Sequence, residues 1–288
     1  MAIYRDYDQA ALDDQYNNRK RVPNFETILD RWAADSAAVR AAGSSRLDIE
    51  YGPSERERLD IFPADADGPV LVFIHGGYWR SLDKDAHSFL APAVNASGAD
   101  LVTIGYPLAP QATMDEIVAA VGRSFAWLWR EGAEHGLDRD RIFVSGHSAG
   151  GHLTASMMSE DWPARDPSLP ADLIKGGCAI SGLYDLEPIR LTFLNEDIRL
   201  DAEMARRQSP IHRVPERAVP LILVVGESES TEFHRQQRDY AAAWAGAGHG
   251  VTDIIAPGAD HFSVLDSMTD SESSLFRALG GLIGIGGS

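Results

Sequence analysis

The spacing of hydrophobic residues divides the chain into three parts. Residues 8–42 carry apolar side chains at helical intervals, which predicts an N-terminal helical arm over residues 1–45. Residues 47–51 and 58–62 alternate apolar with polar side chains on either side of a Gly-Pro-Ser turn, so we expect an antiparallel hairpin at a sheet edge. From residue 70 onward the apolar runs are nearly continuous, as is typical of strands that are covered on both faces.

Strands and helices alternate through this last part. Strands are predicted at residues 70–74, 101–104, 141–145, 174–180, 219–225 and 251–256, and helices at residues 85–96, 112–134, 152–160, 232–245 and 271–282. With the hairpin this makes eight strands, and the later ones should be parallel because helices connect them. The predicted fold class is α/β, a mostly parallel eight-stranded sheet with helices on both faces, within a single domain over residues 1–288.

Residues 183–215 interrupt the alternation. The segment is much longer than a simple connection of ~4–6 residues, and it contains its own helical piece around residues 201–207. An insertion at this point would lie above the carboxyl ends of the strands, where ligands bind in open α/β sheets. We therefore expect a small cap insertion with Leu191, Phe193 and Leu194 in the pocket wall, or else a segment whose apolar side chains only attach it to the core.

Charge and composition exclude several classes of protein. The net charge of −17 and a pI near 4.8 argue against nucleic acid or an anionic membrane as partner, because such surfaces repel the chain. Cys178 is the only cysteine, which excludes an intrachain disulfide and a thiolate metal cluster. No apolar run approaches the ~18 residues of a membrane span, and the first residues lack a signal core. We expect a cytoplasmic protein whose oligomeric state stays open, a homodimer being one option.

One stretch carries the strongest chemical signal. A strand ending at Ser145 runs into Gly146-His147-Ser148-Ala149-Gly150, and a helix follows. Gly-x-Ser-x-Gly between a strand and a helix is typical of a nucleophile elbow, a sharp turn that exposes the serine hydroxyl. Glycines are required at both flanks because β-carbons would collide there. Ser148 is therefore the candidate nucleophile, and the alternative is a chance Ser-Gly turn.

A serine hydroxyl needs a base within hydrogen-bond reach and a carboxylate that orients the base. In this architecture the acid follows the next-to-last strand and the histidine follows the last one. His261 meets the second demand and is the predicted base. Glu229 is the predicted acid, since it lies far enough into its loop to turn back under the imidazole. The other nearby carboxylates are Glu227, Asp185 and Asp260, of which Asp260 adjoins the base too closely to orient it easily.

The run His75-Gly76-Gly77-Tyr78-Trp79 follows the strand at residues 70–74, which is the position of the oxyanion loop in esterases. Backbone N–H groups of Gly77, Tyr78 and Ala149 are expected to stabilise the oxyanion, and His75 should brace the loop. The side chains of Tyr78, Trp79 and Phe193 are predicted to bind a flat apolar leaving group.

No metal or other cofactor is expected. The histidines at 147 and 152 flank the candidate nucleophile, and no other His, Asp or Glu falls at a recognised ligand spacing. Neither kind of glycine-rich phosphate loop is present. The basic run Arg19-Lys20-Arg21 is short and indicates only a solvated face.

Together these motifs resemble the α/β-hydrolase esterases and lipases, and within them the kynurenine formamidase (arylformamidase) group. The resemblance implies an α/β-hydrolase fold in which the second glycine of HGGxW and the next residue, here Gly77 and Tyr78, supply oxyanion N–H groups. The usual acid of that group is Asp, where this chain has Glu229. The similarity extends over nearly the whole chain, through Tyr16-Asn17-Asn18-Arg19, residues 181–188, Ser209-Pro210 and residues 232–236.

The function predicted from these residues is that of a serine hydrolase with a small ester or amide as substrate. An aryl formamide resembling N-formylkynurenine, or a carboxylic ester, would acylate Ser148. The alternatives are a general carboxylesterase or amidase acting on another ester, carbamate or amide, and a non-catalytic ligand-binding protein on a hydrolase scaffold. The last usually lacks its base or acid, whereas Glu229 and His261 are both present.

Overall fold

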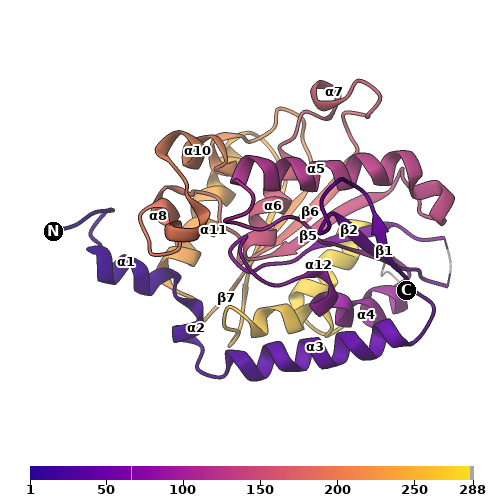
Figure 1. Ribbon diagram of the computed structural model, residues 1–288, viewed down its shortest axis with the longest axis horizontal. Coiled ribbons are helices and arrows are strands. Elements are labelled where there is room, and N and C mark those ends of the chain that lie inside the picture. The colour runs from indigo at the N-terminus through magenta and orange to yellow at the C-terminus, as the bar shows by residue number, and fades with distance from the viewer. Residues whose placement is uncertain (66, 286–288) are drawn as a thin grey trace.

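The computed structural model describes residues 1–65 and 67–285, which contain one eight-stranded sheet (Figure 1). Its strands are β1 (Arg46–Glu50), β2 (Arg58–Phe62), β3 (Val70–Ile74), β4 (Asp100–Ile104), β5 (Ile142–His147), β6 (Ile174–Ile180), β7 (Leu221–Gly226) and β8 (Val251–Ala256). The order is β1-β2-β4-β3-β5-β6-β7-β8. The β1–β2 and β2–β4 pairs are antiparallel, and every later pair is parallel. The predicted α/β class, the antiparallel start and the eight strands are confirmed.

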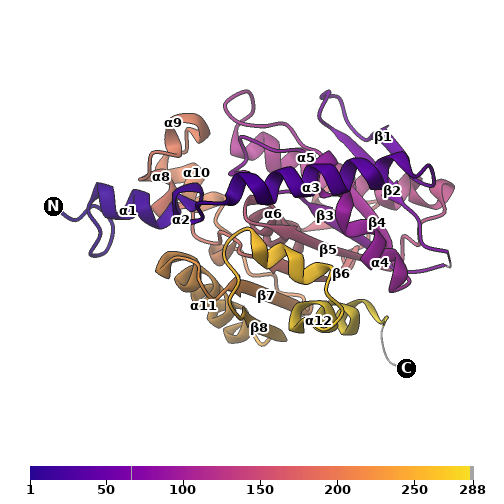
Figure 2. The ribbon, with the colours of Figure 1, turned by 90° about the horizontal axis from the view of Figure 1, so that it is seen from below.

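Helices cover both faces of the sheet. The α-helices are α1 (Gln9–Tyr16), α2 (Asn18–Arg21), α3 (Phe25–Ala41), α4 (Ala91–Ala96), α5 (Met114–Glu131), α6 (Ala149–Met158), α7 (Trp162–Arg165), α8 (Glu187–Arg190), α9 (Asn195–Ile198), α10 (Ala202–Arg207), α11 (Thr231–Gly246) and α12 (Ser274–Ile283). Helices α5, α6 and α11 share one hydrophobic core with the sheet, and α3, α4 and α12 share a second core on the opposite face (Figures 1 and 2). The sheet is thus buried on both sides, as the continuous apolar strands predict.

Helix α5 illustrates how the sequence sets these elements. Thr113 and Glu116 form a reciprocal capping box at its start, which satisfies two backbone N–H groups that have no partner within the helix. Behind the cap, Ile117, Val121 and Phe125 recur every four residues and are fully buried against the sheet. The helical spacing of apolar residues and the capping box therefore both favour a helix at this position.

The N-terminal arm is helical, but it is broken into α1, α2 and α3. Asn17 leaves the helical conformation, and its side chain accepts a hydrogen bond from the N–H of Lys20, which starts the new helix α2. Pro23 follows α2 and has no N–H with which to extend it. The breaks let the arm change direction, so that α3 lies across the sheet while α1 and α2 extend beyond one end (Figure 2).

Two predicted helix boundaries are wrong. The helix expected at residues 85–96 is a 3-10 turn over Lys84–Leu90, and only α4 is α-helical, because Pro92 has no N–H to offer the carbonyl four residues before it. The elbow helix begins at Ala149, not at residue 152, since Ser148 alone makes the sharp turn between strand and helix.

The arm and residues 183–215 pack together at one end of the molecule (Figure 1). The side chain of Gln9 donates to the carbonyl of Leu191 at 2.9 Å, and the N–H of Phe193 donates to the carboxylate of Asp13 at 2.9 Å. Tyr4 donates to Asp185 at 3.1 Å. These contacts join the first residues of the chain to the segment that interrupts the sheet pattern.

Candidate active site

The turn between β5 and α6 has the geometry of a nucleophile elbow. Ser148 has φ 58° and ψ −116°, outside the regions that regular elements use, and its N–H donates to the carbonyl of Ile180 at 2.8 Å. A β-carbon at Gly150 would lie 1.9 Å from the carbonyl oxygen of Ile74, so only glycine allows the new helix to start this close to β3. The strain holds the hydroxyl of Ser148 at the tip of the turn.

Two side chains from separate parts of the chain are aligned with this hydroxyl. The Nε2 atom of His261 lies 3.0 Å from the Oγ atom of Ser148, and its Nδ1 atom lies 2.6 Å from Oε2 of Glu229. An imidazole that donates from Nδ1 to a carboxylate has a free lone pair on Nε2, which then accepts the serine proton. Base and acid follow β8 and β7, so the parallel sheet brings them to the same edge as the elbow.

The carboxylate of Glu229 is fixed by more than the imidazole. Its Oε1 atom accepts from the Ser181 hydroxyl at 2.5 Å and from the Gly226 N–H at 2.8 Å, and its side chain is fully buried. With His261 donating to Oε2, both oxygens are occupied and aimed. Ser181 directly follows the neighbouring strand β6, and no spacing pattern marks it as a partner of Glu229.

The other candidate carboxylates are engaged elsewhere. Asp185 accepts hydrogen bonds from Tyr4 and from the N–H of Glu187. Glu227 accepts from the N–H of Gly258 at 2.7 Å, and Asp260 accepts from the two N–H groups that follow His261 in the chain. Among these four carboxylates, Glu229 is the one that contacts the imidazole.

The loop after β3 lies directly against the elbow. A β-carbon at Gly76 would come within 3.2 Å of the β-carbon of Ser148. Gly77, Tyr78 and Trp79 follow with φ values of 102°, 50° and 56°. Within residues 1–65 and 67–285, the N–H groups of Gly77, Tyr78 and Ala149 donate to no protein acceptor. Among the described residues these three N–H groups are therefore available to a bound ligand.

The arm holds this loop through the phenol of Tyr78. The hydroxyl donates to the carbonyl of Tyr16 at 2.8 Å and accepts from the amide of Asn18 at 3.1 Å. Tyr16 is itself fixed, because its own hydroxyl donates to buried Glu232 on α11 at 2.9 Å. We call these contacts of Tyr78 with Tyr16 and Asn18 the arm clamp. Helical spacing gives no hint of it, since its members lie about sixty residues apart in the sequence.

A cavity of about 370 Å³ opens at the nucleophile. The arm, the oxyanion loop and residues 183–215 all contribute to its wall. It is lined by Tyr16, Asn17, Asn18, Arg19, Leu29, Trp32, Gly77, Tyr78, Arg80, Ser81, Leu82, His147, Ser148, Phe193, Leu194, Asp197, His261 and Phe262. The lining thus combines an apolar wall with a few polar groups, as small-molecule sites usually do.

The prediction that Trp79 binds substrate is wrong. Its side chain is fully buried and does not line the cavity, and its indole N–H donates to Nδ1 of His152 at 3.2 Å. The left-handed turn directs neighbouring side chains of the loop apart, so that Trp79 enters the core while Tyr78 faces the site. Of the predicted cap residues, Phe193 and Leu194 line the cavity, whereas Leu191 does not.

Two further histidines, His147 and His75, contact backbone carbonyls of the site. The ring of His147 contacts the backbone carbonyl of His261 through Nε2 at 2.7 Å. His75 contacts the carbonyl of Gly76 through Nδ1 at 2.8 Å and stacks on Tyr106 with ring centroids 4.2 Å apart, which braces the oxyanion loop. Burial lowers the pKa of both imidazoles well below the usual value, so they remain neutral.

His152 makes the stability of the fold depend on pH. Burial lowers its pKa from 6.5 to about 4, while its two ring nitrogens contact Trp79 and the carbonyl of Gln208. The unfolded chain therefore binds more protons between these pH values, and the stability that neutral His152 provides is complete above about pH 6.5 and falls toward pH 4. We expect the free energy of unfolding to fall by about 1 kcal/mol as the pH is lowered from 7.5 to 5.5, because of the contribution of His152. Urea denaturation of His152→Gln should show a correspondingly weaker pH dependence; an unchanged dependence contradicts the assignment.

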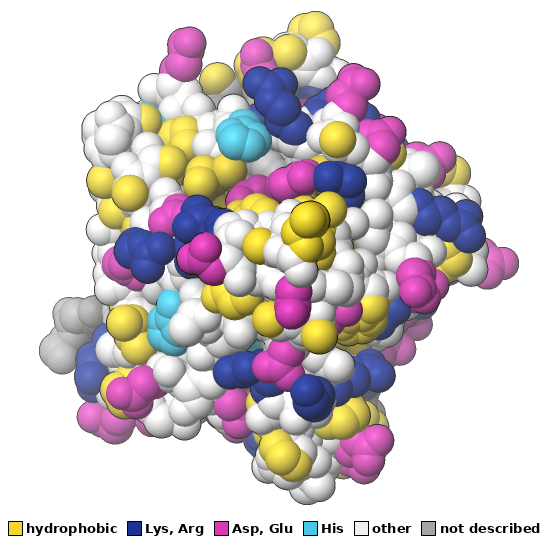
Figure 3. Space-filling view, turned by 90° about the vertical axis from the view of Figure 1, so that its left-hand side faces the viewer, with side chains coloured by type: hydrophobic (Ala, Val, Ile, Leu, Met, Phe, Trp, Pro, Cys, Tyr) yellow, Lys and Arg dark blue, Asp and Glu magenta, His cyan; other side chains and the backbone are white. Residues whose placement is uncertain are grey.

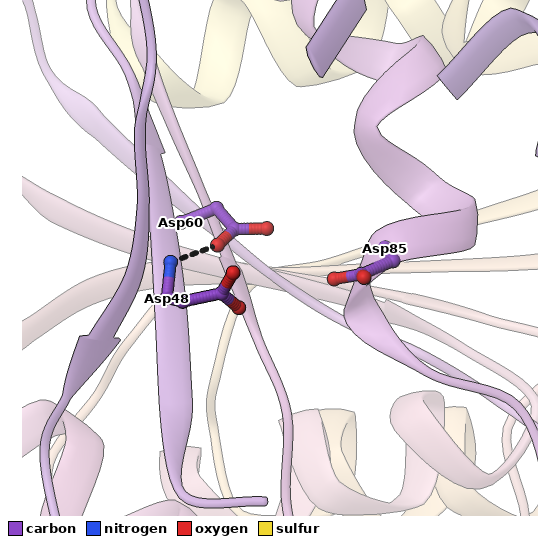
Figure 4. Close-up of side chains that lie close together, drawn as sticks. All are labelled: Asp48, Asp60 and Asp85. Atoms are coloured by element: carbon purple, nitrogen blue, oxygen red, sulfur yellow. Dashed lines mark hydrogen bonds between the residues drawn. The ribbon is translucent and has the colours of Figure 1, made fainter. Parts of the chain in front are cut away.

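A group of carboxylates outside the cavity is an ion-pair cluster. Asp48, Asp60 and Asp85 lie within ligand distance of one another (Figure 4). The ammonium of Lys84 lies 2.7 Å from Asp48, 2.9 Å from Asp60 and 2.7 Å from Asp85, and Arg40 also pairs with buried Asp60. Two cationic side chains therefore occupy the position that a metal ion would need, and the cluster ties β1 and β2 to the turn that precedes α4.

Comparisons with known proteins agree with this geometry. A family model described as an alpha/beta hydrolase fold matches residues 71–265. The chain is 34% identical to kynurenine formamidase from Danio rerio over 85% of this chain and 84% of that protein, and 32% identical to kynurenine formamidase from Salmo salar over 97% and 98%.

A solved structure is similar over nearly the whole chain. The crystal structure of a candidate thioesterase from Silicibacter sp. is 30% identical, with a TM-score of 0.83, over 95% of this chain and 98% of that one. Among the described residues, no helix combines the length and the apolar character needed to cross a membrane. The resemblance inferred from the motifs is confirmed: the chain belongs to the alpha/beta hydrolase fold family, and it is a hydrolase.

Proposed function

We propose that the chain is a serine hydrolase that cleaves small aryl formamides, with N-formylkynurenine as the type of substrate. The observation that carries the proposal is the continuous hydrogen-bonded line from Glu229 through His261 to Ser148 at the wall of a cavity. The similarity to kynurenine formamidases supports the choice of acyl group.

The reaction begins when Oγ of Ser148 attacks the formyl carbon and His261 takes the hydroxyl proton on Nε2. The carbonyl electrons move to oxygen, where the N–H groups of Gly77, Tyr78 and Ala149 stabilise the negative charge. The C–N bond then breaks as His261 returns its proton to the aniline nitrogen. The carboxylate of Glu229 holds the imidazole in the tautomer that this transfer requires and stabilises the imidazolium.

Water completes the cycle. His261 removes a proton from a water molecule that attacks the formyl-enzyme, and formate leaves as Ser148 regains its proton. The formyl group is the smallest acyl group, so little room is required on the acyl side. The aryl part can then occupy the cavity beside Tyr78 and Phe193.

The segment at residues 183–215 is proposed to act as the cap. Phe193, Leu194 and Asp197 from this segment line the cavity, and Arg80 from the oxyanion loop pairs with Asp197. In this proposal the cap forms part of the cavity wall on the leaving-group side, through both apolar and ionic contacts.

A substrate panel tests the proposed activity. N-formylkynurenine should be cleaved with a higher kcat/KM than the phenyl esters of acetate, butyrate and octanoate, and a fluorophosphonate probe should label Ser148. Short aryl esters are also expected to react, because the same groups attack any accessible carbonyl and phenolate is a better leaving group than an anilide. Rapid ester hydrolysis with no release of formate from N-formylkynurenine would identify a carboxylesterase instead. Failure of the probe to label the protein would favour a non-catalytic role.

The arm clamp leads to a prediction of its own. Tyr78→Phe keeps the ring but removes both hydrogen bonds of the phenol, so the N–H groups of the loop lose their alignment with the oxyanion. We expect kcat to fall about tenfold with little change in KM, since removal of one whole oxyanion donor costs about 10²–10³. Asn18→Ala should act in the same direction.

The matched control for the clamp is Tyr7→Phe. This residue is also on the arm, and its hydroxyl contacts Thr231 at 3.0 Å outside the cavity lining. It should leave kcat unchanged. Equal losses in the two Tyr→Phe variants, or a rise in KM without a fall in kcat for Tyr78→Phe, would show that the clamp does not position the oxyanion loop.

A further inference from the structure

Arg19 lines the cavity and is linked to the base through a row of aromatic rings. Its guanidinium lies 5.4 Å from the centroid of the Phe25 ring. Phe25 stacks on Phe262 with centroids 5.9 Å apart, and Phe262 meets the ring of His261 edge-on at 5.5 Å. Both Arg19 and Phe262 belong to the lining, so the guanidinium and the reacting groups share one space.

Arg19 is the cation of this cavity that no carboxylate neutralises. In the part of the chain that the structure describes, its guanidinium forms no ion pair, whereas Arg80 in the same lining is paired with Asp197. The neighbouring cations on α2 are also paired, since Lys20 and Arg21 both contact Asp14. Acidic and basic side chains lie side by side over this end of the molecule (Figure 3).

An arginine without an ion pair is unexpected in so acidic a chain. The chain has 43 acidic and 26 basic residues, so most arginines can find a carboxylate. Among the side chains that line the cavity, Arg19 and Arg80 are cationic and Asp197 is anionic, which leaves one positive charge in excess. A carboxylate group on a bound substrate is unfavourable near a chain with a net charge of −17, so a local cation favours its binding.

A second donor lines the same cavity. The side-chain oxygen of Asn17 caps α2 by accepting from Lys20, and its amide nitrogen donates to no acceptor within residues 1–65 and 67–285. Asn17 also lines the cavity. A planar guanidinium is the donor that pairs best with a carboxylate, and an amide in the same lining can add a hydrogen bond.

We infer that Arg19, assisted by Asn17, binds a carboxylate on the leaving-group side of the substrate. The preferred substrates are then aryl formamides or esters whose aromatic part carries an acidic substituent, such as the amino-acid side chain of a formylated aniline. This inference rests on the proposed function, because it names a substrate feature for the same site. It assigns Arg19 to specificity and leaves the steps at the carbonyl to Ser148 and His261.

The test compares two substrates that differ only in this charge. Formate release from N-formylkynurenine and from its α-carboxamide is measured with the full chain and with Arg19→Met. For the carboxylate substrate we expect kcat/KM to fall on the order of 10–100-fold, mainly through KM, as the loss of a charge-assisted contact implies. For the carboxamide the two proteins should agree within about twofold. Arg19→Lys should recover part of the loss, since it restores the charge without the fork.

Lys20→Met is the matched control. It removes the same charge from the same helix, but Lys20 is paired with Asp14 and lies outside the lining. It should change neither substrate by more than about twofold. An equal loss on both substrates in Arg19→Met, or no loss on either, overturns the carboxylate subsite while the hydrolase activity stands. Wild-type protein that releases no formate from either substrate overturns the proposed function, and the subsite with it.

Discussion

Replacing Ser148 with alanine should lower kcat for aryl formamides and aryl esters by about 10⁴- to 10⁶-fold, since the variant has no hydroxyl to form the acyl-enzyme. The elbow itself should persist. Alanine keeps the β-carbon, so the strained backbone at φ 58° costs the variant what it costs the native protein. The activity is measured as formate released from the aryl formamide and p-nitrophenol released from a p-nitrophenyl ester. The midpoint of thermal unfolding shows whether the variant is as stable as the native protein.

Ser159→Ala is the appropriate control for that experiment. Ser159 follows α6, and its hydroxyl donates to the carbonyl of Ala155 outside the cavity. The variant should retain full activity. If Ser148→Ala kept more than about one hundredth of the native kcat, another nucleophile would have to be sought.

Glu229→Gln should lower kcat by about 10⁴-fold, the cost of holding the imidazole in the wrong tautomer. Ser181 and the N–H of Gly226 both donate to Oε1, so the amide oxygen of the new glutamine would take that position. Its NH2 group would then face Nδ1 of His261 and force the ring proton onto Nε2, toward the nucleophile. The imidazole could no longer accept the serine proton.

The same substitution type provides the control. Asp185→Asn removes a charge from a carboxylate near the arm, one that accepts from Tyr4 and lies 3.5 Å from Arg235. It should lower kcat by no more than a few-fold, because this carboxylate does not contact the imidazole. A larger loss in Asp185→Asn than in Glu229→Gln would reassign the acid. The loss of kcat in Glu229→Asp should lie between the losses in Asp185→Asn and Glu229→Gln, since a side chain shorter by one methylene reaches the imidazole poorly.

Local patterns were enough to predict the sheet and two members of the triad. The elbow motif carries its own strand, turn and helix, which marks Ser148, and the place of His261 after the last strand follows from the topology. The sequence predicts Glu229 as the acid but leaves Glu227 and Asp185 as alternatives, because it does not reveal which carboxylate has its other oxygen held by Ser181 and Gly226. Those two partners come from different strands and have no spacing signature.

Other features of the site depend on packing between distant segments. Trp79 adjoins Tyr78 in the sequence, yet a left-handed turn sends one ring into the core and the other to the cavity. Arg19 belongs to a short basic run that indicates only a solvated face, and its place in the cavity wall follows from the fold of the arm. In the same way Asn18 meets the loop only because α1 docks on α11.

The arm clamp connects residues 16–18 to the loop that we propose binds the oxyanion. A proteolytic cut after residue 18, or translation from a later start, would take away both partners of the Tyr78 hydroxyl and leave the eight strands and the triad intact. The same cut would also remove Leu12 and Tyr16, which are fully buried in the core, so a lower stability should accompany the loss of turnover.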